Sequence, residues 1–232
     1  MLRGNRLIAV TISLNSGKSL PFVLADIPRN IVDGVLVIDC VSSDDTISAA
    51  RQGGAMIVTE PSGRQGVAIR RALLQLAEYE PHIVVFLDSY YRYFPSEIKR
   101  LVEPIVEAGY DLVLGARVLN GCEGNIFSLA SNFWRDRLLS AFQKEVYRFS
   151  DVTPFRAIRY SALTQLNLAS DDLGWLIEMP VRAFRQGFRI CEVPVHYNAD
   201  APAFPRKEFD EDSVFGRKRL LSAFAKYQHL LR

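Results

Sequence analysis

Short apolar runs alternate with amphipathic segments through the first half of the chain. The runs are rich in the β-branched and aliphatic residues typical of buried strands, and the amphipathic segments repeat their apolar positions at helical spacing. Strands are predicted over residues 7–14, 34–40, 55–59, 82–88 and 111–116, and helices over 19–29, 46–52, 67–79 and 95–109. Such alternation predicts βαβ units, so we expect a parallel sheet covered by helices.

The alternation becomes irregular after residue 117. The pattern there predicts helices over 127–145, 175–186 and 214–231, strands over 153–160 and 188–197, and a mobile loop over 199–212. No internal repeat and no linker divides the sequence, so a single domain over residues 1–232 is predicted.

The composition narrows the class of protein. With 232 residues, 49% of them apolar, and a formal net charge of +2, the chain is typical of a soluble globular protein and gives no reason to expect nucleic-acid binding. No apolar run is long enough for a membrane span, and the N-terminus does not resemble a signal peptide. Three scattered cysteines argue against a disulfide framework, and three distant histidines argue against a zinc site. A reducing, cytoplasmic location is therefore expected.

Acidic residues follow three of the predicted strands. The buried run 83–87 ends at Asp88, where a carboxylate is expected at the carboxyl edge of the sheet, and ligands bind at that edge in open α/β sheets. Asp39, Ser42 and Asp44 follow the second strand, where they could bind a nucleobase or ribose, although the pattern taken alone favours Asp44 as the cap of the next helix. Glu60 follows the third strand, either in the same binding site or in an ordinary turn.

Residues 12–19, ISLNSGKS, end in the Gly-Lys-Ser of a phosphate-binding P-loop. The motif requires a glycine five residues before Gly17, and this chain has Ile12 there. Without that glycine the loop does not readily wrap a phosphate in its N–H groups. The sequence therefore favours a simple turn, and a requirement for Lys18 in nucleotide binding would indicate the P-loop instead.

Several segments in register resemble the family 2 glycosyltransferases, in particular the dolichyl-phosphate-mannose-synthase-like branch. The resemblance covers about residues 7–197. It is carried by VLADIPRNIVDGVLVIDCVSSDDT, VTEPSGRQG, IVVFLDSYYRYFPSEIKRLVEPI, DLVLGAR, DVTPFRAIR and GWLIEMPVRAFRQGFRICEVPVHY.

This resemblance implies a nucleotide-sugar glycosyltransferase fold of the GT-A, Rossmann-like type, with a mostly parallel central sheet flanked by helices. A nucleoside-diphosphate sugar would lie across the strand ends, with Mn²⁺ or Mg²⁺ on its diphosphate, for inverting transfer to a lipid-phosphate or other acceptor. Residues 1–117 would form the nucleotide-binding half, 118–198 the acceptor-side half, and 199–232 a variable loop and a C-terminal basic amphipathic helix.

The resemblance also assigns roles to individual residues. Donor binding would involve Asn15, Asp39, Ser42, Asp44, Glu60 and Asp88, with Asp88 at the diphosphate and the metal. Asp151 and Arg156 would line the acceptor side, and Glu178 would be the general base that deprotonates the acceptor. A buried glutamate with a raised pKa can act as a base, whereas the alternative for Glu178 is a surface position on an amphipathic helix.

The departures from the family pattern fall at the site. Tyr90 stands where the family's Asp-x-Asp motif has its second metal-binding aspartate, and Tyr93 replaces a further acid. Two hypotheses follow. Either the chain is a working transferase with an altered, weakly metal-dependent or metal-independent donor site, or it is an inactive homologue that serves as a binding or regulatory subunit. A cation would suit the first hypothesis, and the candidates are Arg64, Arg92 and Lys207.

The C-terminal segment 214–231 is basic and amphipathic. Its apolar residues Leu220, Leu221, Phe224 and Leu231 could lie on an anionic membrane surface, which would suit a polyprenyl-phosphate acceptor at the inner face of a membrane. The alternative is a helix packed on the edge of the sheet with a solvated basic face.

Overall fold

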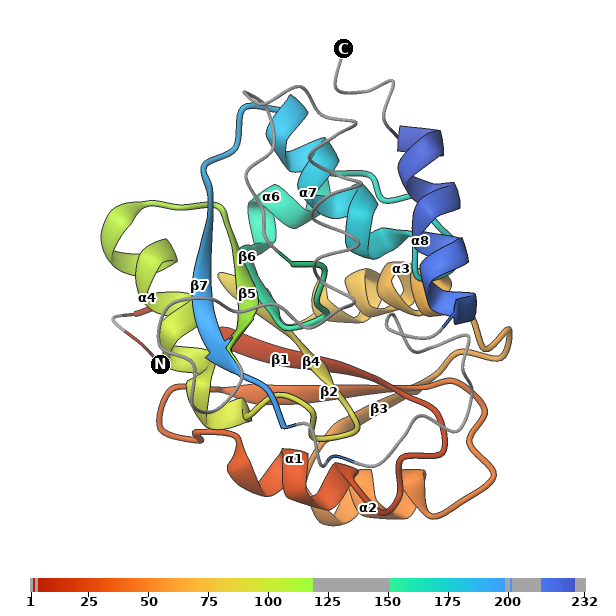
Figure 1. Ribbon diagram of the computed structural model, residues 1–232. Coiled ribbons are helices and arrows are strands. Elements are labelled where there is room, and N and C mark those ends of the chain that lie inside the picture. Colours follow the sequence, from red (N-terminus) through yellow and green to blue (C-terminus); the bar gives the residue numbers. More distant parts are fainter. Residues whose placement is uncertain (1, 3, 119–150, 199–200, 202–213, 228–232) are drawn as a thin grey trace.

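The computed structural model describes the chain except for residues 1, 3, 119–150, 199–200, 202–213 and 228–232. Its centre is a seven-stranded sheet with the order β3-β2-β1-β4-β6-β5-β7 (Figure 1). The strands are β1 (Leu7–Ser13), β2 (Gly34–Asp39), β3 (Met56–Thr59), β4 (Ile83–Asp88), β5 (Leu112–Val118), β6 (Arg156–Arg159) and β7 (Ile190–His196). The sheet joins strands from both the expected nucleotide-binding half and the expected acceptor-side half.

The sheet is mostly parallel, as predicted. β6 alone among these strands runs the other way, because it pairs antiparallel with both β4 and β5. The predicted strand over 153–160 is shorter in the structure, since the chain turns at Arg159 into α6 (Tyr160–Gln165), a helix that the sequence pattern did not predict. The other predicted strands and helices of the described residues are confirmed to within a few residues.

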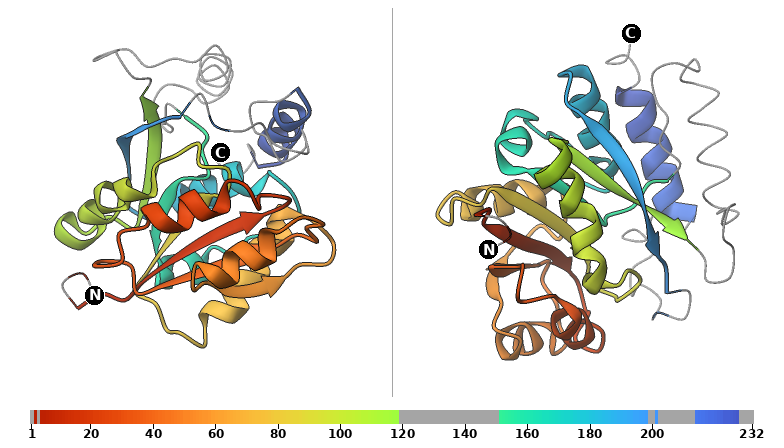
Figure 2. Two further views of the ribbon diagram at one scale, coloured as in Figure 1. Left: turned by 90° about the horizontal axis from the view of Figure 1, so that it is seen from below. Right: turned by 90° about the vertical axis from the view of Figure 1, so that its left-hand side faces the viewer.

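Helices cover both faces of the sheet (Figures 1 and 2). One face packs against α1 (Leu20–Asp26), α2 (Thr46–Gln52) and α4 (Ile98–Ala108), which continues from the short helix η1 (Pro95–Glu97). The other face packs against α3 (Gln65–Leu76), α6, α7 (Trp175–Arg185) and α8 (Val214–Tyr227). Burial on both faces explains why the central strands read as continuous apolar runs rather than alternating ones.

The C-terminal helix α8 packs against α7 and not on the edge of the sheet (Figure 2). Its apolar residues Leu220 and Phe224 are buried in the core shared with α3 and α7 and Leu221 is half-buried against it, so these residues are not available to a membrane, while Leu231 lies outside the described residues. Lys218, Arg219 and Lys226 are exposed. Among the described residues, no helix is both long and apolar enough to cross a bilayer.

Two predicted elements, the helix over 127–145 and the loop over 199–212, lie outside the described residues, apart from residue 201.

Candidate functional site

The predicted acidic residues gather at the carboxyl edge of the parallel strands. Asp39 at the end of β2 pairs in register with Ser13 of β1, and Asp88 at the end of β4 pairs with Ile12 of the same strand. The two aspartates therefore flank the end of β1. Glu60 joins them, because its main-chain N–H donates to the carbonyl of Asp39 at 2.7 Å. The strand ends thus bring these three acids to one edge.

Asn15 ties the loop after β1 to the loop after β2. Its N–H donates to the hydroxyl of Ser42 at 2.9 Å, and its side-chain oxygen accepts from the N–H of Ser43 at 2.8 Å. Asn15 has φ 51°, in the left-handed region where asparagine is the most tolerated residue after glycine. Asn15 and Ser42 therefore hold the loop after β1 and the loop after β2 together.

The Gly-Lys-Ser segment is a turn and not a P-loop. The N–H of Ser16 donates to Thr46 Oγ1 at 2.8 Å, and the N–H of Gly17 donates to Asp44 Oδ2 at 2.9 Å. A P-loop offers such N–H groups to a phosphate, but here side chains of the neighbouring loop accept these two. Lys18 is exposed.

Asp44 and Glu60 are stabilised as anions. Burial acts to raise the pKa of Asp44, but hydrogen bonds from Thr46 and Gly17 outweigh it and hold that pKa below its ordinary value. Burial likewise opposes ionisation of Glu60, and hydrogen bonds from Ser62 together with nearby Arg71 lower its pKa. Both side chains are therefore charged at neutral pH, and Asp44 accepts bonds from the first residue of α2 as well as from Gly17.

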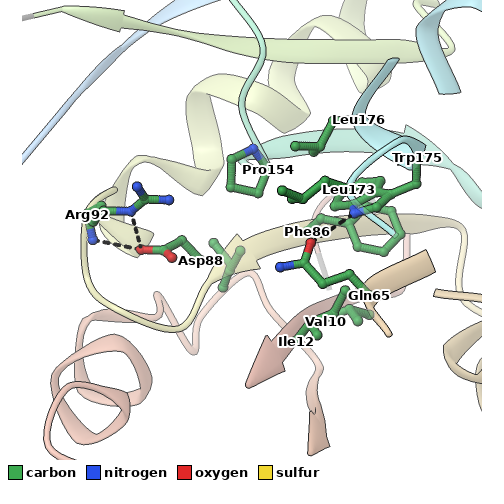
Figure 3. Close-up of a pocket in the computed structure, with 11 residues that line it drawn as sticks. Val10, Ile12, Gln65, Phe86, Asp88, Arg92, Pro154, Leu173, Trp175 and Leu176 are labelled. Carbon is green, nitrogen blue, oxygen red and sulfur yellow. Dashed lines mark hydrogen bonds and ion pairs between the residues drawn. The ribbon is translucent and has the colours of Figure 1, made fainter. Parts of the chain in front are cut away.

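Asp88 forms a buried ion pair with Arg92 (Figure 3). The turn after β4 passes through Tyr91, which has φ 59°, and this left-handed residue returns the chain so that the Arg92 N–H donates to Asp88 Oδ2 at 2.8 Å. The guanidinium Nε lies 3.7 Å from the same oxygen, and the two side chains are only 6% and 3% exposed. Positive φ at a bulky residue is a strained conformation of the kind found at functional sites.

Tyr90 bonds to the loop after β1. Its ring is buried, and its hydroxyl donates to the main-chain carbonyl of Leu14 in the loop after β1. Burial raises the pKa of Tyr90, and the negative charge of Asp88 adds to the effect, so the phenol stays neutral. Tyr93 lies in the core, with its ring centroid 5.8 Å from Phe155. Both tyrosines therefore have structural contacts at the two positions that the sequence resemblance assigned to acids.

A small pocket opens beside Asp88 (Figure 3). Asp88 and Arg92 form its charged wall, and Trp175 at the start of α7 forms much of its apolar wall, packed 5.4 Å from the ring of Phe86. The Trp175 indole N–H donates to Gln65 Oε1 at 3.3 Å. The cavity volume is about 30 Å³. The remaining lining residues are Val10, Ile12, Leu87, Pro154, Leu173 and Leu176.

Sequence reasoning did not identify Trp175, Phe86 or Leu173 as site residues. Their apolar side chains follow the same pattern as core residues, so nothing in the sequence distinguishes them.

The acids at this edge do not fit a divalent cation held by protein ligands. No group of three or more His, Cys, Asp or Glu side chains in the described part of the chain is arranged to hold a metal. Asp88 is paired with a guanidinium, and Tyr90 directs its hydroxyl to a main-chain carbonyl. Hard cations prefer several oxygen ligands, of which carboxylates are the strongest in this setting.

Glu178, the predicted general base, lies in α7 with its carboxylate completely buried. The carboxylate accepts hydrogen bonds from the main-chain N–H groups of Ala169 and Ser170 and from Arg182 Nε at 2.7 Å. The surface alternative for Glu178 is therefore wrong. Glu178 is not among the residues that line the pocket beside Asp88, and the base assignment stays a prediction.

Asp151 and Arg156 are also buried in specific contacts. Asp151 forms a two-pronged ion pair with Arg117, with both side-chain bonds 2.7 Å long. Arg156 donates to the carbonyl of Leu176 at 3.1 Å and lies over the Trp175 ring at 4.9 Å. Arg156 is not among the residues that line the pocket, but it contacts Trp175 and Leu176, which are.

Of the two remaining candidate cations, only Arg64 belongs to the described residues, and it does not line this pocket. Arg64 pairs with Asp171 at 3.0 Å and is largely exposed, and Lys207 lies outside the described residues.

The chain is similar to known glycosyltransferases. The family model described as "Glycosyl transferase family 2" matches residues 9–166. An uncharacterized glycosyltransferase of Mycobacterium tuberculosis is 31% identical over 84% of this chain and 87% of its own length. A dolichyl-phosphate hexose transferase of Haloferax volcanii is 32% identical over 88% of this chain and 87% of its own.

A crystal structure of glucosyl-3-phosphoglycerate synthase from Mycobacterium tuberculosis, in complex with Mn²⁺, UDP-glucose and phosphoglyceric acid, has a similar fold. Its TM-score is 0.74 at 22% identity, covering 98% of this chain and 81% of that one. At this identity the likeness bears on the fold alone.

Proposed function

Because this chain belongs to glycosyl transferase family 2, we propose that it transfers a sugar from a nucleoside-diphosphate sugar to a lipid-phosphate acceptor. The observation that carries the proposal is the convergence of Asp39, Glu60 and Asp88 at the carboxyl ends of parallel strands. Asp39 and Glu60 would bind the nucleoside, and Asp88 with its neighbours would lie at the diphosphate.

The reaction is a substitution at the anomeric carbon of the sugar. A phosphate oxygen of the acceptor forms the new bond, the bond from that carbon to the diphosphate breaks, and the nucleoside diphosphate leaves with the electron pair. In-line attack from the opposite face inverts the configuration.

A phosphate acceptor suits the paired state of Glu178 and Asp151. The second pKa of a phosphate monoester is about 6, so its oxygen is already anionic at neutral pH and needs no base. Glu178 is paired with Arg182, and Asp151 is paired with Arg117. A hydroxyl acceptor would require one of these carboxylates to leave its pair. The relative whose name contains dolichyl phosphate supports the same acceptor class.

A lipid acceptor would be met at a membrane surface. The exposed Lys218, Arg219 and Lys226 of α8 would then face anionic headgroups at the cytoplasmic side. This contact would be electrostatic, since the apolar face of the helix is buried.

A second candidate function is that of an inactive homologue that binds a ligand or a partner protein. The observations that favour it are Tyr90 in place of an acid and the closed pair between Asp88 and Arg92. Only the transferase would form a glycosylated product.

Incubation of the protein with UDP- and GDP-sugars and a polyprenyl phosphate, with and without Mn²⁺, separates these functions. Mass spectrometry would detect the glycosylated lipid, and Asp39→Asn is the control variant. A product that the variant does not form supports the transferase. Nucleotide binding without product, across the donor panel, would favour the inactive homologue.

A further inference from the structure

We propose that Arg92 supplies the positive charge that a divalent cation would supply at Asp88, so that the chain binds a nucleoside diphosphate without metal. The inference rests on the proposed function, because it concerns the diphosphate of the same donor. It assigns Arg92 as a donor-binding residue.

The first support is the fixed position of Arg92. Its main-chain N–H is bonded to Asp88, its carbonyl accepts from the N–H of Asn198 at 2.8 Å, and the carbonyl of Tyr91 accepts from the Asn198 side chain at 3.2 Å. The turn after β4 is thereby anchored both to its own strand and to the segment after β7. The guanidinium is held beside Asp88 and lines the same pocket.

The second support is the balance of charge. The net charge of two aspartates with a divalent cation is zero, and the net charge of one aspartate with one guanidinium is also zero. If Tyr90 replaces one acid and Arg92 replaces the cation, the net charge of the site therefore stays the same. A second carboxylate in this buried position would have left an anion without its counter-charge, which is costly in a protein interior.

The third support is the structural role of Tyr90. Its hydroxyl bonds to Leu14, so the side chain joins the two loops that border the edge of β1 and β4. This role needs a neutral donor, and burial keeps the phenol protonated. Tyr90 is thus built into the protein framework rather than into a metal site.

The chemistry of the guanidinium suits the task. Arginine carries five N–H donors in a planar fork, so a single side chain can bond to a carboxylate and a phosphate together. Charge-assisted bonds of this kind to phosphate oxygens are among the stronger hydrogen bonds in proteins.

Calorimetric titration of UDP and GDP into the protein, once in EDTA and once in Mn²⁺, tests the inference. We expect at least one nucleotide to bind in EDTA with an affinity within about threefold of that in Mn²⁺. Binding that appears only with Mn²⁺ would overturn the role of Arg92 and leave the proposed transferase intact. If neither nucleotide binds under either condition, both proposals fail.

The variant Arg92→Gln removes the charge and keeps much of the side-chain length. We expect its affinity for the diphosphate to fall by roughly 10- to 100-fold. Arg92→Lys keeps the charge but loses the planar fork of N–H donors. Its affinity for the diphosphate should lie between those of Arg92→Gln and the parent protein. An affinity unchanged in both variants would contradict the inference.

Arg100→Gln is the matched control. Arg100 is 52% exposed on α4, pairs with Glu97 at 3.4 Å and does not line the pocket, so its loss should leave nucleotide binding unchanged. Thermal unfolding of each variant identifies any that fail to fold. If Arg92→Gln does not fold, the comparison of EDTA with Mn²⁺ in the parent and in Arg92→Lys still decides the question.

Discussion

The hydroxyl of Tyr90 donates a hydrogen bond to the main-chain carbonyl of Leu14, and so links the turn after β4 to the loop after β1. Both residues are buried. The sequence resemblance assigned this position to a metal-binding acid, whereas in the structure its side chain joins two loops at the edge of the sheet that carries Asp88.

Tyr90→Phe removes this hydroxyl and leaves the ring in place. We expect the free energy of unfolding to fall by about 1–3 kcal/mol, because the variant leaves the buried carbonyl of Leu14 without this donor. Urea denaturation measures the change, and Tyr79→Phe, on a half-buried ring just beyond α3, is the control. Nucleotide binding should survive the substitution in the folded variant, and its loss would show that the hydroxyl itself contacts the ligand.

Glu178→Gln separates a structural carboxylate from a catalytic one. The glutamate accepts bonds from two main-chain N–H groups and from Arg182, so the substitution breaks a buried ion pair. We expect the free energy of unfolding to fall by roughly 3 kcal/mol, while the transfer rate of the folded variant changes less than tenfold.

A general base would give the opposite pattern. Its removal typically lowers the rate by about 10²- to 10⁴-fold, and a loss of that size without a loss of stability would restore the predicted base. Arg182→Gln is the matched variant, because it breaks the same pair from its partly exposed side and leaves the carboxylate in place.

Gly66 at the start of α3 packs against the loop that Glu178 holds. A Cβ at this position would lie 2.1 Å from the main-chain oxygen of Ser170, and main chain cannot rotate away as a side chain can. Gly66→Ala should therefore destabilise the fold by about 1–3 kcal/mol or more. Leu74→Ala, at an exposed position of the same helix, is the control. Equal melting temperatures for the two variants would show that the loop can move.

Much of the fold was predictable because apolar residues repeat at different spacings in strands and in helices. The run 83–87 and the acid that ends it predicted both β4 and the position of Asp88 at the sheet edge. The helix α6 was missed because it begins directly where β6 ends, at Tyr160, without a turn residue to separate the two.

The site was harder to predict than the fold. Asp39, Glu60 and Asp88 were expected at one edge because each follows a strand of the predicted parallel sheet. The partner of each charged side chain could not be predicted in this way. Arg92 was one of three candidate cations, and only the left-handed turn at Tyr91 brings its N–H back to Asp88. Glu178 matches the family motif, but its three donors come from a loop and a helix turn whose geometry the motif does not encode.

Cys40 gives the protein a specific dependence on alkaline pH. Burial, with the negative charges of Asp39 and Glu60, raises the pKa of its thiol from 9.0 to about 12. Between these two values the unfolded chain loses the proton and the folded chain keeps it, so the free energy of unfolding falls as pH rises above about 9. The slope should approach about 1.4 kcal/mol per pH unit for this group.

Urea denaturation at pH 8, 9 and 10 measures this slope. Tyr90 adds to it above pH 10, since its pKa is also raised, so the informative quantity is the difference between the parent and Cys40→Ala. We expect the variant to lose less stability than the parent as pH rises from 9 to 10. Parallel curves would mean that Cys40 ionises as readily in the folded protein as in the unfolded chain, and that its end of β2 is open to solvent.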